Sequence, residues 1–153
     1  MSDERFTLDS NILVYSVDRR DARKQELALA ILRAAAGKDC PLALQSIGEF
    51  YAAATRKLKL PPSDVRERAR QLINSFETFS YTRTAMRVGL EEAALMRFSL
   101  WDGVLVASAA EAGCTTIFSE DMGDKARLGT IMVCRPFDDT GLTSFAREML
   151  DLK

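Results

Sequence analysis

The chain has 153 residues, of which 47% are hydrophobic and 28% charged, and this suits one globular domain with a sizeable core. The net charge of −1 argues against a protein built only to coat nucleic acid, and no apolar run is long enough to span a membrane. The sequence contains no histidine, which excludes histidine acid–base catalysis, histidine-dependent triads and histidine metal sites. Any hydrolytic chemistry must rest on carboxylates, which favour a hard metal ion such as Mg²⁺ or Mn²⁺.

The cysteines and the N-terminus bear on the compartment. Cys40, Cys114 and Cys134 are odd in number, widely spaced and form no CxxC pair, so we expect buried thiols in a reducing compartment. Residues 1–5 do not resemble a signal peptide. The sequence therefore predicts a cytoplasmic protein.

The first element is an apolar, β-prone run that ends on an aspartate. We expect residues 5–8 to form the central strand of a parallel sheet, with a short helix following through Tyr15. Asp9 would then lie at the carboxyl end of the strand, where open α/β sheets bind their ligands. Local structure offers another explanation, because Asp9 or Ser10 could simply cap the helix.

Strand and helix patterns alternate along the rest of the chain. We expect helices over 22–36, 46–58, 63–76, 84–98, 103–110 and 142–150, and strands over 42–44, 79–82, 115–118 and 130–134. Gly89 weakens the helix over 84–98, which could be two short helices. The alternation predicts one α/β domain over 1–153 with a mostly parallel sheet.

This pattern places four carboxylates at the same edge of the predicted sheet. Asp9 and Asp121 follow strands, while Glu49 and Asp102 lie in the first turns of helices. In a right-handed βαβ fold the ends of the strands and the starts of the helices meet at one edge of the sheet. Acids gathered there repel one another unless a cation neutralises them, so the pattern favours a Mg²⁺ site.

Each acid also has an explanation in local structure alone. Ser46 and Glu49 have the form of a capping box, which we weigh equally with function, and Ser99 with Asp102 fits one loosely. A metal site has an evident use, because a bound divalent ion can lower the pKa of a water and neutralise charge on a phosphodiester. Basic residues near the rim could hold the flanking phosphates: Arg56, Lys57, Lys59, Arg83 and Arg87.

At this point the chain resembles the PIN-domain ribonucleases and, among them, the VapC toxins of type II toxin–antitoxin modules. The resemblance rests on four motifs in order, which together cover nearly the whole chain from Phe6 to Phe137. They are Leu8-Asp9-Ser10-Asn11-Ile12-Leu13-Val14-Tyr15, Ser46-Ile47-Gly48-Glu49-Phe50, Leu100-Trp101-Asp102 and Ser119-Glu120-Asp121-Met122. Each motif alone is weak, whereas four in this order are specific.

The resemblance implies a three-layer α/β/α domain with a mostly parallel sheet of about five strands. It implies a Mg²⁺- or Mn²⁺-dependent endoribonuclease that acts as a toxin on RNA. The acidic cluster would be catalytic and metal-binding, and two polar residues would support it: Asp9, Glu49, Asp102 and Asp121, with Asn11 and Ser119 as the supporting pair. Ser10 stands where Thr is commoner in the family, and the loop 123–127 is less typical of it.

The resemblance also implies partners. Family members commonly form homodimers, and a toxic ribonuclease requires an antitoxin. We expect an extended or helical antitoxin segment to lie along the groove beside the helix over Ser46–Leu60, with one arginine pointing at Asp9 and Asp102. Phe50, Ala53 and Ala54 could contact that segment, although they could equally belong to the core.

Two alternatives come from other functional classes. The first is a PIN-like domain that binds RNA or protein without cutting, against which the presence of all four acids argues. The second is a phosphoryl-transfer domain of the receiver or haloacid-dehalogenase type, which needs a well-placed lysine after a later strand. Lys125 is the only late candidate before Lys153, and its position in a Gly-Asp loop argues against this class.

Overall fold

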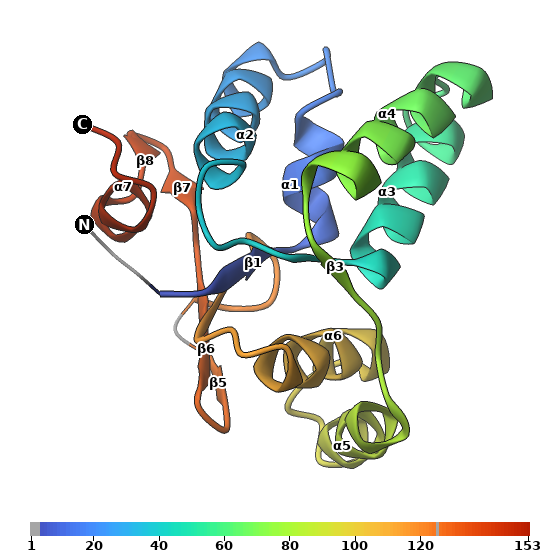
Figure 1. The fold of residues 1–153 in the computed structure, drawn as a ribbon, viewed down its shortest axis with the longest axis vertical. Coiled ribbons are helices and arrows are strands. Elements are labelled where there is room, and N and C mark those ends of the chain that lie inside the picture. The colour runs from blue at the N-terminus through green and yellow to red at the C-terminus, as the bar shows by residue number, and fades with distance from the viewer. Residues whose placement is uncertain (1–3, 125) are drawn as a thin grey trace.

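The structure is a computed structural model that describes residues 4–124 and 126–153 (Figure 1). Its helices are α1 (Ser10–Tyr15), α2 (Ala22–Ala35), α3 (Leu44–Arg56), α4 (Pro62–Ser75), α5 (Arg83–Ala94), α6 (Leu100–Glu111) and α7 (Ser144–Met149). Its strands are β1 (Phe6–Leu8), β2 (Leu42–Ala43), β3 (Thr78–Phe79), β4 (Thr116–Phe118), β5 (Arg127–Leu128), β6 (Ile131–Cys134), β7 (Phe137–Asp138) and β8 (Gly141–Leu142). None of the helices in these ranges is long and apolar enough to cross a membrane.

The main sheet has the strand order β1-β4-β6-β5. β1, β4 and β6 are parallel, and β5 runs antiparallel to β6 in a hairpin that the sequence pattern did not predict. The parallel pair β2-β3 lies beside β1, because Thr7 Oγ1 donates to Pro41 O at 2.6 Å and Phe6 N to Asp39 O at 3.2 Å. The predicted mostly parallel α/β architecture is therefore confirmed.

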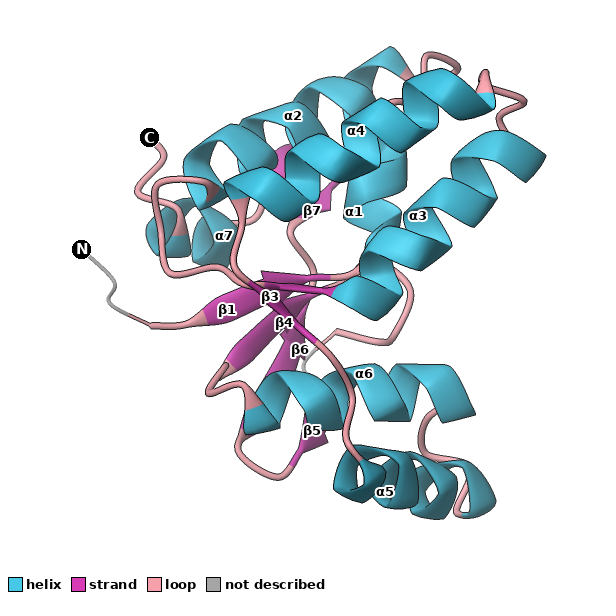
Figure 2. Cartoon of the chain, turned by 45° about the vertical axis from the view of Figure 1, so that its right-hand side comes forward, coloured by secondary structure: helices cyan, strands magenta, loops and turns pink. Residues whose placement is uncertain are grey.

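Helices cover the sheet on both sides, as the three-layer prediction requires. Figure 2 shows α1, α2, α3, α4 and α7 on one side, and α5 and α6 on the other. Successive strand residues point to opposite faces. Phe118 accordingly joins the core under α1 and α2, where it packs edge-to-face against Phe6 with the ring centroids 5.6 Å apart. Ile117 points to the other face and joins the core under α6 with Leu105.

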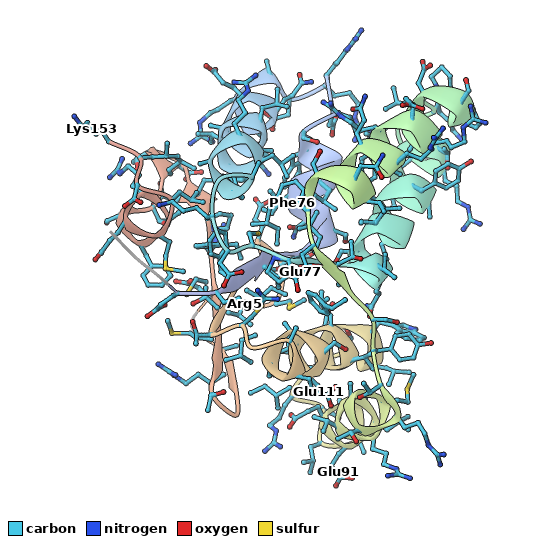
Figure 3. All side chains as sticks on the ribbon, in the orientation of Figure 1. Arg5, Phe76, Glu77, Glu91, Glu111 and Lys153 are labelled. Atoms are coloured by element: carbon cyan, nitrogen blue, oxygen red, sulfur yellow. The ribbon has the colours of Figure 1, made fainter. Side chains whose placement is uncertain are left out.

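Arg5 fixes the opposite edge of the sheet, at the start of β1. Its Nε donates to Ala112 O at 2.7 Å and its Nη2 to Glu77 Oε1 at 3.0 Å, while Nη1 pairs with Asp39. Figure 3 shows Arg5 and Glu77 side by side on neighbouring segments. One guanidinium thus joins the end of α6 to the start of β3, and this helps to set where the other ends of these elements lie.

Gly89 does not divide the helix that contains it. α5 runs without a break from Arg83 to Ala94, and Gly89 lies where α6 crosses it. A Cβ atom at Gly89 would lie 2.4 Å from Val104 Cγ2, and one at Gly103 would lie 3.2 Å from the Gly89 Cα. The glycine is needed for this close approach of two helices, which overrides its low helix propensity.

The predicted capping box at Ser46 and Glu49 is wrong. α3 begins at Leu44, two residues earlier, and its N-cap residue Ala43 makes no side-chain cap. Ser46 is fully buried, and its Oγ has no hydrogen-bond partner among the described residues. Glu49 therefore lies one turn into the helix, and capping does not explain its presence there. The prediction of three buried cysteines is confirmed.

Candidate active site

Asp9 lies at the carboxyl end of β1 and at the start of α1. Its backbone N–H donates to Phe118 O at 2.9 Å, which continues the strand pairing by one residue. Its Oδ1 accepts from Ser10 N at 2.7 Å, so Asp9 is indeed the N-cap of α1. The cap uses one carboxylate oxygen, and the other oxygen is directed elsewhere. Asp9 is buried, with 4% of the residue exposed.

Ser119 connects two of the predicted acids. It follows β4 directly, its N–H donates to Cys134 O at 3.0 Å, and the side chain is buried. Its Oγ lies 2.7 Å from Asp9 Oδ2 and 3.0 Å from Asp121 Oδ1. Asp121 itself is exposed. The supporting role predicted for Ser119 thus has a geometric basis, because its hydroxyl bridges the two carboxylates.

Asp102 approaches the same place from α6. It lies in the first turn of the helix, where its N–H donates to Ser99 Oγ at 3.3 Å, so the loosely predicted cap is present. Burial raises the pKa of the Asp102 carboxyl, the Ser99 hydroxyl opposes this, and the charge of Asp121 adds to it. Asp102 and Asp121 are therefore close enough to repel each other.

The pKa shifts indicate that three of the acids influence one another. The pKa of Asp9 is raised to about 7, chiefly by burial, while the Ser119 hydroxyl and the Ser10 N–H lower it. The charges of Asp121 and Asp102 raise it further. Like charges at short range disfavour ionisation, so the carboxylates of Asp9, Asp102 and Asp121 repel one another at this edge of the sheet.

Glu49 reaches the site from another side. It is exposed on α3, and its Oε1 accepts from Gln45 Nε2 at 3.0 Å. The same Gln45 nitrogen donates to Trp101 O at 3.0 Å, which connects α3 to the start of α6. Glu49 and Asp121 line a common cavity of about 480 Å³. Glu49 thus faces the acidic edge across this cavity, and Gln45 is a contact that the sequence did not reveal.

Two further polar side chains lie close to the predicted acids in the chain. Asn11 lines the cavity of Glu49 and Asp121, and both polar atoms of its amide are buried with no hydrogen-bond partner among the described residues. Glu120 lies between Ser119 and Asp121 in the chain, and its Oε1 accepts from Lys24 Nζ at 2.9 Å. Lys24 Nζ also lies 4.8 Å from the ring centroid of Tyr15. The sequence pattern did not reveal this Lys24–Glu120 pair, and its only signal was the position of Glu120 inside a motif.

Four of the five basic residues predicted for the rim fall into two groups, and the fifth, Lys59, is exposed and lines neither cavity. Arg56 and Lys57 line the cavity that contains Glu49 and Asp121, whereas Arg83 and Arg87 line a separate one. The candidate Lys125 lies outside the described residues, and with it part of the loop 123–127.

The residues suggested as apolar partner contacts prove different from one another. Phe50 and Ala54 are fully buried in the core, so the core interpretation is correct for them. Ala53 is partly exposed and lines the cavity of Glu49.

The side chains at this edge carry the types of oxygen ligand that a hard divalent cation prefers. Carboxylate and amide oxygens are the ligands that Mg²⁺ and Mn²⁺ take, and the unpartnered Asn11 amide adds one to the acids. Burial is the main cause of the raised pKa of Asp9, and a cation would relieve the smaller part that comes from the charges of Asp121 and Asp102. Within residues 4–124 and 126–153, however, no three acidic or cysteine side chains converge as closely as in a closed coordination shell. The site supplies suitable ligands without arranging them as a preformed cage.

Comparisons with protein-family models and with curated proteins find no match. Several solved structures do match. A toxin–antitoxin complex from Klebsiella pneumoniae matches at 17% identity over 86% of this chain and 98% of that chain, with a TM-score of 0.62. FitAcB from Neisseria gonorrhoeae matches at 17% over 86% and 97%, with a TM-score of 0.63. VapC20 from Mycobacterium tuberculosis, a Sarcin–Ricin loop cleaving toxin, matches at 19% over 76% and 92%, with a TM-score of 0.57. Across most of its length, this chain therefore has the fold of the VapC and FitB PIN-domain toxins.

Proposed function

We propose that this chain, which has the fold of VapC-type PIN-domain toxins, is a Mg²⁺- or Mn²⁺-dependent endoribonuclease. The observation that carries the proposal is the bridge from Asp9 through Ser119 to Asp121, with Asp102 beside it, at the carboxyl edge of a parallel sheet. Ligand sites of α/β sheets lie at this edge. The carboxylates gathered there repel one another, which favours a bound cation. The chain contains no histidine, so catalysis would have to use carboxylates.

Asp9, Asp102, Asp121 and Glu49 would hold the metal ion. When bound, such an ion supplies a water of lowered pKa and neutralises charge on the phosphodiester. Ser119 Oγ keeps Asp9 Oδ2 and Asp121 Oδ1 at fixed positions, so that both carboxylates stay aligned as ligands.

Other side chains of this cavity would act on water and on RNA. The buried amide of Asn11 has unused hydrogen-bonding capacity with which it can orient water or a ligand. Arg56 and Lys57, on the wall of the same cavity, would bind phosphates on either side of the cleaved bond.

We further propose that the chain is the toxin of a toxin–antitoxin module. Support comes from the Klebsiella match, which is a toxin–antitoxin complex, and from the chemistry of the site. A guanidinium pairs bidentately with carboxylates and can take the place of a metal ion, so an antitoxin arginine directed at Asp9 and Asp102 would inhibit the enzyme. The antitoxin segment would lie beside α3 near Ala53, and the toxin itself would be a homodimer, since two-fold pairing is the commonest assembly.

The test is cleavage of total RNA in Mg²⁺. Wild-type protein should cut, and Asp9→Ala and Asp102→Ala should not, although both should retain the fold by circular dichroism. Glu91→Ala provides a matched control, because Glu91 is an exposed acid on α5, at the outer side of the molecule in Figure 3. Equal cleavage by wild type and Asp9→Ala would show that the activity comes from a contaminant or from another site.

A binding domain without nuclease activity is the competing function. Co-expression with the gene immediately upstream separates the two. A stable complex in which RNA cleavage is suppressed supports the toxin. Harmless expression of the wild-type chain alone, with neither RNA cleavage nor a co-purifying partner, would favour the binding domain.

A further inference from the structure

Two large aromatic side chains stand exposed next to the acidic edge. Tyr81 and Trp101 are each 47% exposed, and their ring centroids lie 5.9 Å apart with an interplanar angle of 62°. An edge-to-face pair of this kind covers only part of each ring. Exposed apolar side chains that gather at one place on the surface mark candidate binding sites. Trp101 is also the only tryptophan in the chain.

The position of Trp101 ties this pair to the proposed active site. It occupies the first turn of α6, immediately before Asp102. Its carbonyl oxygen accepts from Gln45 Nε2, and the same nitrogen donates to Glu49 Oε1, each at 3.0 Å. The backbone that carries the indole is thus joined to two of the four proposed metal ligands.

A cationic hollow of about 410 Å³ adjoins Tyr81, lined by Tyr81, Thr82, Arg83, Met86 and Arg87. Its wall is well anchored. Thr82 Oγ1 caps α5 by accepting from Ala85 N at 3.1 Å, and it donates to Glu111 Oε2 at 2.7 Å. The loop that carries Tyr81 is therefore fixed to both helices of this layer.

The two arginines of this hollow favour an anionic occupant. Arg83 and Arg87 are exposed and four residues apart on α5, so they lie on one side of the helix and repel each other. A phosphate placed between them would remove that repulsion. An apolar surface of another protein would not, and this difference in charge is the reason to favour RNA as the occupant.

We propose that Tyr81 and Trp101, with Arg83 and Arg87, form a platform on which unpaired RNA bases stack next to the cleaved phosphate. The proposal rests on the proposed ribonuclease function. Bases in an A-form duplex are stacked on one another, whereas unpaired bases can stack on aromatic rings and guanidinium planes. The arginines would bind the backbone of the same nucleotides. Trp101 and Tyr81 are positioning residues in this scheme.

Trp101 provides a direct readout, because it is the only indole in the protein. The experiment titrates the full chain with a short unstructured RNA in a chelator, so that neither metal binding nor cleavage is needed. We expect quenching of the Trp101 fluorescence by the single strand and little change with a duplex of the same sequence. Equal quenching by both RNAs, or by neither, would overturn the platform.

Variants locate the effect. Trp101→Ala and Tyr81→Ala should each weaken binding of the labelled single strand about tenfold, whereas Tyr81→Phe keeps the ring and should bind as wild type does. Arg87→Ala should reduce the slope of log affinity against log salt by about one. Tyr51→Ala removes a comparably exposed aromatic from α3 and should change nothing.

Catalysis separates this inference from the function on which it rests. If the chain cuts RNA in Mg²⁺, Trp101→Ala should raise KM more than it lowers kcat, because the platform binds rather than reacts. Cleavage with an unchanged KM would refute the platform and leave the ribonuclease intact. Quenching by single-stranded RNA without any cleavage would support the platform and refute the ribonuclease. A change in Trp101 emission with protein concentration alone, accompanied by a rise in mass, would assign the pair to self-association instead.

Discussion

Ser119 Oγ lies 2.7 Å from Asp9 Oδ2, and this contact joins the end of β4 to the end of β1. A hydroxyl carries a single proton, yet Ser119 also lies 3.0 Å from Asp121 Oδ1. When Asp9 is ionised, the proton is shared between two acceptors. When Asp9 is protonated, its own O–H can donate to Ser119, which is then free to donate to Asp121. The pair therefore links the protonation of Asp9 to the charge at Asp121.

Ser119→Ala should raise the pKa of Asp9 above about 7, because the Ser119 hydroxyl is the largest influence that lowers it. Above that pH the variant should also lose about 1.5–3 kcal/mol of unfolding free energy, as expected for a lost hydrogen bond to a buried carboxylate. Titration of the aspartate carboxyl carbons by NMR measures the pKa. Ser108→Ala is the control, since this buried hydroxyl donates to Val104 O within α6. An Asp9 pKa that stays in place would show that Ser119 does not stabilise the ionised form.

Stability without metal should fall as the pH rises. The pKa of Asp9 is about 7 in the folded protein against 3.8 ordinarily, so the folded state keeps a proton that the unfolded chain has released. The stabilisation is complete below pH 3.8 and is lost by about pH 7, with a difference of up to about 4 kcal/mol. Asp9→Asn should flatten this part of the curve of unfolding free energy against pH, measured in a chelator. A slope that is the same in both proteins would assign it to other groups.

Mn²⁺ or Mg²⁺ should stabilise the wild-type protein against heat, because a ligand that binds only the folded state shifts the unfolding equilibrium. An ion at a hundred times its Kd contributes about 2.7 kcal/mol. Asp102→Asn should abolish the shift in Tm, whereas Glu91→Gln, at an exposed acid of α5, should retain it. Calorimetry that detects no binding at millimolar ion, with and without RNA, would contradict the proposed metal site.

The products of cleavage should carry 5′-phosphate and 3′-hydroxyl ends, because a metal-activated water rather than the ribose 2′-hydroxyl is the proposed nucleophile. End-labelling and mass analysis of the products distinguish these ends from 2′,3′-cyclic phosphates, which would refute the mechanism. Asp121→Ala should be inactive although folded. If it cuts normally, its contact with Ser119 serves structure alone.

Gly89→Ala should destabilise the protein by about 1–3 kcal/mol through overpacking against Val104, whose Cγ2 lies 2.4 Å from the position of the added Cβ. Val104→Ala should recover part of that loss in the double variant. Gly48→Ala is a sharp control, because Gly48 is also inside a helix and its Cβ would meet nothing within 4 Å. That change should be neutral or stabilising by about 0.5–1 kcal/mol. Denaturant unfolding of the wild type, Gly89→Ala, the double variant and Gly48→Ala decides whether the helix crossing requires the glycine.

Where the sequence was informative, the signal was local. The apolar run that ends on Asp9 predicted β1 and the helix after it, and Ser99 before Asp102 predicted the cap of α6. The alternation of such runs was enough to predict the α/β class. Side chains on the buried face recur every two residues in a strand and every three to four residues in a helix, so the pattern can be read locally.

Local pattern failed where distant contacts decide. Ser46 and Glu49 match a capping box, yet α3 starts at Leu44 because the chain leaves β2 directly into the helix. Gly89 has a low helix propensity, yet its lack of a side chain is what lets α5 and α6 approach each other. In both cases tertiary packing outweighs propensities of about 1 kcal/mol per residue.

The sequence by itself determined which side chains are available for chemistry: carboxylates without histidine, with Asp9, Asp102 and Asp121 placed where strands end or a helix begins. Only the tertiary structure decided how those groups meet. It brought Ser119 between Asp9 and Asp121, residues more than a hundred positions apart in the chain, by pairing β1 with β4 in one register. It also left Tyr81 and Trp101 together on the surface. The physical reason is that distances between chain-distant side chains are set by strand register and helix packing, which depend on the whole core rather than on any one motif.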